Sequence, residues 1–286
     1  MDHLAKRLES RSLFKFIVGM TNFDLAELRF LAQVYTLAGA DIIDVAAEPT
    51  VVAATRRALA AIRGQLPSLS DLPRIMVSAA LAHDPHIEGV RLDPAHRAAV
   101  APASTSDLLV SIGACLDQGA DMVEIHASDS DDFSLREALE ALDTLLDGRY
   151  LSVCLGTQGQ RSPREVIRQA QLAYGIHGPR TMIQAEGLHT TRRGDPASSL
   201  QGLALGQALL AHTSAYVVVA GGANHWTRSM ADVLGIGVHG VAVGSYARAL
   251  VKGLQAIDPQ GAAWEPVAQV ARSFVGQLRA GVDREV

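Results

Sequence analysis

The sequence has 286 residues, of which 48% are apolar, 19% charged and 5% aromatic, and its formal net charge is −5. This negative charge and the lack of a basic cluster argue against a general nucleic-acid binder. No apolar run reaches the roughly 18 residues that span a bilayer, and the polar N-terminal segment MDHLAKRLESRS lacks the apolar core of a signal peptide. The sequence therefore predicts a soluble cytoplasmic protein that has no membrane or nucleic-acid partner.

Apolar segments of strand length alternate with segments of helical periodicity along the chain. The expected strands are 13–19, 41–47, 74–80, 121–126, 150–155, 181–186, 215–221 and 238–244. Two helix starts stand out between them, because Asp24 with Glu27 matches a capping box and Ser162 precedes a proline at the first helical position. The pattern predicts an α/β fold, a single (β/α)₈ TIM barrel with its core at 12–252 in one domain of 1–286. A doubly wound open sheet is the alternative, although no GxGxxG motif follows the first strand.

Three further segments bear on the organisation of this barrel. Residues 38–47 (AGADIIDVAA) and 118–127 (QGADMVEIHA) repeat a GAD turn before a strand, as repeated barrel units would. Residues 80–104 form a long connection after the third strand, which predicts a lid or a binding loop. Residues 262–281 predict an added amphipathic C-terminal helix that packs against the barrel, a second copy or a protein partner.

Glycine turns end the last two expected strands. One apolar run ends in Gly221, Gly222 and Ala223, and the next ends in Gly244 and Ser245. Glycines at the tips of parallel strands allow close backbone approach to a ligand. The helix that follows Gly244 offers free N–H groups and the positive end of its dipole to an anion. Because the last two strands of such barrels commonly hold a phosphate, the sequence predicts a small phosphorylated ligand here.

Strand alternation places a set of polar side chains on one face, which we expect to line the barrel interior. The members of this set are Lys15, Asp44, Ser78, Glu124, His126, Gln184 and Glu186. Buried charges are costly unless they are paired, so the lysine should contact at least one of the acids. One interpretation is a purely structural network. The favoured interpretation is a catalytic or binding constellation, since an inert interior is more readily built from apolar residues.

These residues suggest proton-transfer chemistry. Glu124 and Glu186 are the candidate general acid and base, because neighbouring carboxylates can be driven to different pKa values, and Asp44 is the candidate orienting group. Lys15 has an electrostatic or proton-transfer role, since nearby acids raise its pKa whereas a Schiff-base lysine needs a lowered one. His126 and Gln184 complete the candidate catalytic set.

Other polar residues fit two interpretations each. His126, His189 and His225 fall at or beyond strand ends and are candidate ligands of a divalent metal, but no HxH or HExxH spacing supports a metal site. His225 alternatively contacts the phosphate. The remaining candidates are His83 and His86 in the long connection, Arg192 and Arg193 as an anion clasp or a solvated pair, Trp226 as a stacking or packing residue, and Cys154 as a small buried hydrophobe or a thiol.

Several motifs resemble a known family. LFKFIVG, YTLAGADIIDVAAEP, IMVSAALAHDPH, MVEIHA, IQAEG and AGGANH…GSYAR, in order over 13–251, are similar to the light-dependent period protein A family of cyanobacteria. More remotely, they resemble the plastid and cyanobacterial barrel family of unknown function. The resemblance implies a (β/α)₈ barrel, iron–sulfur clusters and redox sensing for the circadian clock. The cysteine-rich insertion of that family is missing here, and Cys115 and Cys154 alone cannot form a four-thiolate site, so we expect no iron–sulfur cluster.

Three functions follow as hypotheses. The first is an enzyme of the lyase, isomerase or synthase type that acts on a phosphorylated small molecule. The second is a barrel that binds FMN through the same glycine turns. The third is a non-catalytic redox or regulatory sensor, or a partner-binding barrel that uses residues 80–104 and the C-terminal helix. The sequence does not identify a cofactor, and a divalent metal or FMN fits the pattern.

Overall fold

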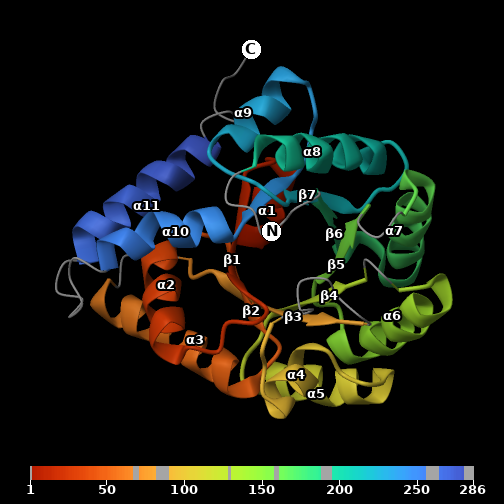
Figure 1. Cartoon of the computed structure of the whole chain (residues 1–286), viewed down its shortest axis with the longest axis horizontal. Coiled ribbons are helices and arrows are strands. Elements are labelled where there is room, and N and C mark those ends of the chain that lie inside the picture. The colour runs from red at the N-terminus through yellow and green to blue at the C-terminus, as the bar shows by residue number, and fades with distance from the viewer. Residues whose placement is uncertain are drawn as a thin grey trace.

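A computed structural model describes residues 2–66, 71–81, 90–127, 130–157, 161–187, 195–255 and 264–279. In this part of the chain eight parallel strands close into a barrel in chain order, and helices surround it (Figure 1). The first strand pairs with the eighth, with Phe14 opposite Val241. The predicted TIM barrel is therefore confirmed, and the alternative of an open sheet is wrong.

The strand bounds agree with the predicted ones to within two residues. The strands are β1 (Leu13–Gly19), β2 (Ile42–Ala46), β3 (Arg74–Ala80), β4 (Met122–His126), β5 (Leu151–Gly156), β6 (Thr181–Glu186), β7 (Tyr216–Ala220) and β8 (Gly240–Val243). The helices are α1 (His3–Glu9), α2 (Leu25–Leu37), α3 (Pro49–Gln65), α4 (Pro94–Val100), α5 (Thr105–Asp117), α6 (Asp132–Leu146), α7 (Pro163–His177), the 3₁₀ turn η2 (Gly178–Arg180), α8 (Pro196–Leu210), α9 (Trp226–Val233), α10 (Ser245–Gln255) and α11 (Trp264–Arg279).

Side-chain caps explain where several helices begin. Ser162 and Glu165 form a complete capping box at the start of α7. Asp24 caps α2 by accepting from the next turn, but the carboxylate of Glu27 pairs with Lys252 of α10 at 2.9 Å. The predicted capping pattern therefore holds for Asp24, whereas Glu27 ties two helices together.

The repeated GAD turns are structural. Asp41 Oδ2 accepts a hydrogen bond of 2.8 Å from the Phe14 amide of β1, and Asp121 Oδ2 accepts one of 2.9 Å from the Ile75 amide of β3. The glycines of both turns have positive φ (90° and 97°), as chain reversals after a helix require. Each repeat thus ends a helix and satisfies a backbone donor at the N-terminal end of the barrel.

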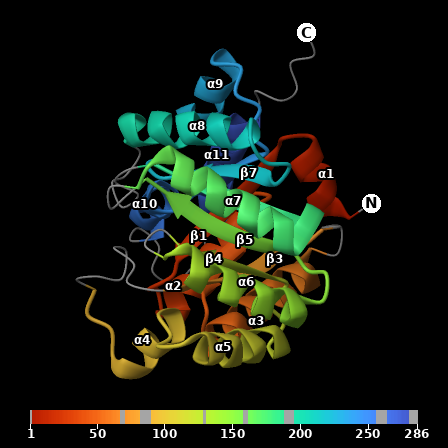
Figure 2. The same ribbon diagram turned by 90° about the vertical axis from the view of Figure 1, so that its right-hand side faces the viewer.

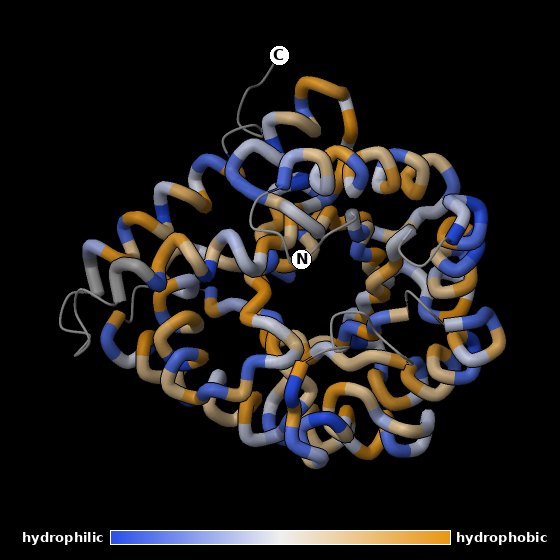
Figure 3. The backbone as a smooth tube through the Cα atoms, viewed as in Figure 1, coloured by the Kyte–Doolittle hydropathy of each residue, from blue (hydrophilic) through white to orange (hydrophobic). Residues whose placement is uncertain are grey.

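Two apolar clusters lie on opposite faces of the strands. The larger one fills the space between the strands and the surrounding helices, and in Figure 3 apolar and polar residues alternate along these helices. The smaller one lies inside the barrel and includes Ile42, Met76, Met122 and Met182 together with Leu4 and Leu8 of α1. Figure 2 shows α1 at the end of the barrel that carries the N-terminus. This apolar floor closes the barrel beneath the next inward-facing layer.

The segment 80–104 differs from the expected continuous loop. Residues 82–89 lie outside the described residues, but Pro94–Val100 forms α4. Asp93 caps this helix through the His96 amide at 2.9 Å, and a proline occupies its first turn. These two signals in the sequence start a helix, so the expectation of a loop across this part was wrong.

The predicted C-terminal helix is confirmed as α11, which packs against α2 and α10. Among the described helices, none is by itself both long and apolar enough to cross a membrane. The bent pair α4 and α5, which meet at 93°, reaches that length and apolar content only when the two are taken together.

Candidate functional site

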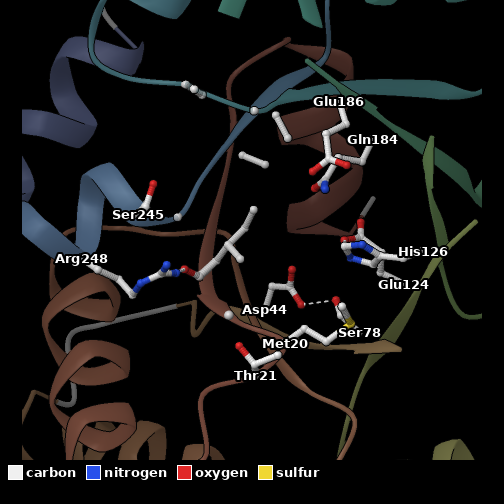
Figure 4. Close-up of a pocket in the computed structure, with 18 residues that line it drawn as sticks. Met20, Thr21, Asp44, Ser78, Glu124, His126, Gln184, Glu186, Ser245 and Arg248 are labelled. Atoms are coloured by element: carbon white, nitrogen blue, oxygen red, sulfur yellow. Dashed lines mark hydrogen bonds and ion pairs between the residues drawn. The ribbon is translucent and has the colours of Figure 1, made fainter. Parts of the chain in front are cut away.

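A cavity of about 200 Å³ opens at the C-terminal ends of the strands. Its inner wall consists of polar side chains from β2, β3, β4 and β6, namely Asp44, Ser78, Glu124, His126, Gln184 and Glu186. Its opposite wall consists of the β7 and β8 turns and the start of α10, with Gly221, Gly222, Ala223, Gly244, Ser245 and Arg248. Figure 4 shows the acidic groups on one side and Arg248 with Ser245 on the other. The structure thus brings together all the predicted inward residues except Lys15 and all the predicted turn residues at one cavity.

Lys15 lies beneath the cavity and does not line it. Its Nζ contacts Glu124 Oε2 at 2.6 Å, Asp44 Oδ2 at 3.0 Å and Gln184 Oε1 at 2.9 Å, and the residue is only 1% exposed. These three acceptors match the three protons of an ammonium group. Burial alone would lower the pKa of Lys15, but the charges of Asp44 and Glu124 outweigh it and raise the pKa. Lys15 is therefore a fixed cation, which suits an electrostatic role.

The two acids on Lys15 differ in their ionisation. Ser78 donates to Asp44 Oδ1 at 2.5 Å, and Ser152 donates to Glu124 Oε2 at 2.6 Å. Burial raises the pKa of Asp44 despite the attraction of Lys15. Burial also opposes ionisation of Glu124, but Lys15 and His126 overcome it and lower its pKa to about 2. The two neighbouring carboxylates therefore differ in pKa: Asp44 is the more readily protonated, and Glu124 is held as the anion.

The second carboxylate oxygen of Glu124, Oε1, lacks a hydrogen-bond donor among the described residues. Glu124 is fully buried, and its Oε1 accepts no hydrogen bond from the residues that the structure describes. His126 Nε2 lies 3.4 Å from this oxygen, beyond an ordinary hydrogen bond. Because a buried acceptor without a donor costs free energy, a donor of a bound ligand fits this position.

Cys154 lies between Gln184 and Glu186 behind this wall. Gln184 Nε2 donates to the Cys154 sulfur at 3.3 Å, and the thiol contacts Glu186 Oε2 at 3.5 Å. Burial and the charge of Glu186 raise the pKa of Cys154 to about 12. The group is therefore a neutral thiol rather than a nucleophilic thiolate, which agrees with its interpretation as a small buried residue.

The glycines of the β7 turn are required by the backbone itself. Gly221 and Gly222 have φ of 81° and 63°. A Cβ at Gly221 would lie 2.7 Å from the Gly187 nitrogen, and one at Gly222 would lie 2.5 Å from the Asp195 oxygen. These close contacts are with the chain that connects β6 to α8, and both glycines also line the cavity, where close approach of a ligand stays a prediction.

Arg248 is the charged residue of the cavity lining that was not predicted from the sequence. It lies in the first turn of α10, and its Nη1 donates to the backbone oxygens of Ile17 at 2.8 Å and Val18 at 2.9 Å. The guanidinium thus fixes α10 to the end of β1 and places a cation beside the helix N-terminus. Its sequence signal was the arginine of GSYAR, one turn after the Gly244-Ser245 strand end.

The histidine candidates for a metal site do not all meet at the cavity. His126 lines it, whereas His225 Nδ1 bonds the Tyr246 hydroxyl at 2.9 Å and is not part of the lining. His83, His86, His189, Arg192 and Arg193 lie outside the described residues. Across the described ranges, no three side chains of the metal-binding types form a group suited to a metal ion. Trp226 is 60% exposed and contacts the His225 ring.

Comparison with known sequences agrees with the motif resemblance over part of the chain. Residues 1–63 match the model of a family described as a protein of unknown function (DUF561). A stretch of 90 residues, 30% of this chain, is 40% identical to Light dependent period A of Synechococcus elongatus. The match spans about a quarter (24%) of that relative's length. These matches support a family of the light-dependent period protein A type, as the motifs indicated.

Solved structures with similar folds are enzymes of low sequence identity. Rubisco of Pyrococcus horikoshii has a TM-score of 0.60 at 10% identity, over 95% of this chain and 58% of that one. The YdjI aldolase of Escherichia coli has a TM-score of 0.58 at 8% identity, over 98% and 96%. The 3-deoxy-D-arabino-heptulosonate 7-phosphate synthase of Thermotoga maritima has a TM-score of 0.53 at 10% identity, over 92% and 84%. At these identities the likeness concerns the fold.

Proposed function

We propose that this barrel is an enzyme that binds a small phosphorylated molecule and transfers protons within it, in a reaction of the lyase, isomerase or synthase type. The observation that carries the proposal is the two-ended cavity. One end offers Arg248 and the start of α10, and the other offers the carboxylates of Asp44, Glu124 and Glu186. The first two of these carboxylates pair with the buried Lys15. A molecule with an anionic end and a reactive polar end suits both walls at once.

The anion end would hold the phosphate. The first amides of α10 lack partners within the helix and carry the positive end of its dipole. Gly244 and Ser245 bring this helix start to the cavity, and Arg248 adds a full positive charge. Charge-assisted hydrogen bonds of this kind are about twice as strong as neutral ones. Similar barrels include enzymes named for a bisphosphate and for a 7-phosphate, which supports this choice of ligand.

The acidic end would perform the proton transfers. Glu124 is held as the anion and lines the cavity, so its carboxylate is the proposed base. Asp44, whose pKa is raised, retains a proton more readily and is the proposed acid. Glu186 lies on the same wall and is a further candidate acid or base. Gln184 and His126 also line the cavity and would orient the substrate. Lys15 acts as a positioning residue that fixes the two acids on either side of its ammonium group.

The test is turnover of a panel of phosphorylated compounds by the intact chain, followed by NMR. Glu124→Gln and Asp44→Asn should each lower the turnover of an identified substrate by about a hundredfold or more, as loss of a general base or acid does. The control is Glu140→Gln, which removes the same charge from the surface, where Glu140 is 59% exposed. Turnover that survives in Glu124→Gln would contradict the assignment.

A second function, a non-catalytic sensor or partner-binding barrel, is favoured by the partial identity to Light dependent period A. A defined partner that co-purifies with the chain, and is retained after Glu124→Gln and Glu186→Gln, would support this role. In this role the cavity would bind a ligand without catalysing a reaction.

Binding of FMN is a third proposal. The cavity of about 200 Å³ is smaller than the roughly 300–1,000 Å³ of most sites for small organic ligands, which favours a compact ligand over a flavin. A yellow protein with a flavin spectrum would reverse this preference. Metal analysis of the same preparation tests the proposals of a divalent metal and of no iron–sulfur cluster.

A further inference from the structure

We infer that the outer face of α8 and the exposed side of α9 form a contact surface for a second copy of this chain. The surface lies on the flank of the barrel, where Figures 1 and 2 show α9 outside α8. Three observations point to a second copy as the occupant: the lack of charge on α8, the exposed apolar residues of α9, and the way in which the two helices are joined.

The helix α8 differs from the other described α-helices in its lack of charge. Its sequence PASSLQGLALGQALL contains no Asp, Glu, Lys, Arg or His, whereas each of the others carries at least one such residue. Leu200 is 45% exposed, and Ala204 and Gln207 on the same side are also exposed. A surface helix normally has charged and polar residues on its outer side, and a helix without them is usually covered. The outer face of α8 is therefore suited to cover by another chain.

The neighbouring helix α9 adds exposed apolar side chains. Trp226, Val233 and Leu234 are 60%, 86% and 53% exposed, and spacings of seven and eight residues place them on one side of the helix. The two charged residues of α9, Arg228 and Asp232, pair with each other at 3.0 Å. The exposed side of α9 is thus apolar, and exposed apolar patches mark interaction sites more often than single apolar residues do.

The two helices are joined so that these side chains belong to one surface. Ser199 Oγ of α8 lies 3.2 Å from Thr227 Oγ1 of α9, and both residues are buried. Leu200 and Trp226 are their neighbours in the chain, so exposed apolar side chains flank this buried contact. Because Ser199 lies in the first turn of α8, α9 adjoins the N-terminal end of that helix and leaves the C-terminal half of its outer face open.

The charge and shape of this surface fit a second copy related by a two-fold axis. Such a contact uses the same patch on both chains, so residues near the axis meet their own copies. Charged residues there would meet like charges, whereas the uncharged middle of α8, around Ala204, faces itself without repulsion. Antiparallel pairing of α8 with its copy also brings α9 of each chain toward the open half of the other α8. The surface is therefore complementary to itself, and it offers little to a strongly charged partner.

Sedimentation velocity of the full chain between about 1 and 100 µM tests the inference. We expect the mass to double over this range, as a modest interface allows. Val233→Glu and Ala204→Glu should each weaken the dimer about tenfold or more, because each places like charges in the contact. Val110→Glu on α5 is the matched control, since Val110 is 72% exposed, and it should leave the dimer unchanged. All three positions are exposed, so circular dichroism should show a native fold in each variant.

A mixing experiment tests the two-fold geometry. Ala204→Lys should also weaken the dimer when it is alone, and an equimolar mixture of Ala204→Glu with Ala204→Lys should restore it, because opposite charges then meet at the middle of α8. A chain that stays monomeric at about 100 µM overturns the inference and leaves the surface to a different protein. A dimer that survives both Val233→Glu and Ala204→Glu also overturns it, since the contact then lies elsewhere. A mixture that dimerises no better than either variant alone overturns the antiparallel pairing of α8.

Discussion

Replacing Lys15 by methionine removes the cation at the centre of the barrel and keeps most of the side-chain volume. The change leaves Asp44 and Glu124, which are 3% and 0% exposed, without their shared partner. Removing one member of a buried ion pair costs about 3–5 kcal/mol. Separately, the lowering of the Glu124 pKa from 4.5 to about 2 corresponds to roughly 3 kcal/mol. Both routes predict that Lys15→Met lowers the free energy of unfolding by about 3–5 kcal/mol near pH 7.

The pH dependence distinguishes lost charge pairing from lost packing. In the native chain the folded pKa of Glu124 lies below its ordinary value. Its stabilisation is therefore present above pH 4.5 and is lost as the pH falls toward 2. In the variant, burial without Lys15 raises the pKa of both acids, so proton uptake favours the folded state. The stability difference between the two proteins should accordingly shrink as the pH falls from about 7 to about 4.

Urea denaturation followed by circular dichroism at several pH values measures this difference. The double variant Lys15→Met with Glu124→Gln should recover about 1–3 kcal/mol relative to Lys15→Met, because the orphaned charge is gone. A stability difference that does not change with pH, or a double variant whose two losses simply add, would refute the electrostatic account of Lys15.

Three further predictions concern the anion end, the glycine turn and the barrel base. Arg248→Gln should weaken the binding of phosphorylated probes about tenfold in titration calorimetry, and unchanged affinity would speak against an anion site. Gly222→Ala places a Cβ 2.5 Å from a backbone oxygen at φ of 63°, and it should lower the free energy of unfolding by about 1–3 kcal/mol. Gly276→Ala lies in open space on α11 and should raise the free energy of unfolding by up to about 1 kcal/mol. Similar melting temperatures for the two variants would contradict this prediction. Asp41→Asn, which weakens the 2.8 Å pair with Arg279, should cost about 1–3 kcal/mol in urea denaturation, and an unchanged midpoint would show that the pair is dispensable.

The sequence predicted the strands and the inward polar set because both depend on local order. In MVEIHA, Glu124 and His126 alternate with apolar residues, and this period of two assigns them to one face whatever the neighbouring strands do. The order of parallel strands then brings Lys15 and Asp44 close together, since β1 and β2 are adjacent and Asp44 lies opposite Ile17, two residues beyond Lys15. Local periodicity and a known barrel geometry were sufficient for this part of the site.

The remaining features depend on contacts between distant segments. Arg248 belongs to the cavity because its guanidinium reaches the carbonyls at the end of β1, more than 200 residues earlier in the chain. His225 is kept from the cavity by the Tyr246 hydroxyl on the next helix. Leu4 and Leu8 of α1 close the barrel floor although their segment is polar in overall composition. No spacing within a short window encodes such pairings, so they emerge only once the barrel is closed.

The apolar floor also accounts for the polarity of the cavity. The apolar side chains of α1 and the methionines of β3, β4 and β6 fill the barrel below the ion network. Lys15 pairs with Asp44 and Glu124 between this floor and the cavity, and α10 begins with Arg248 on the far wall of the cavity. The field between the two walls therefore runs across the cavity, with its negative side at the carboxylates and its positive side at Arg248 and the start of α10.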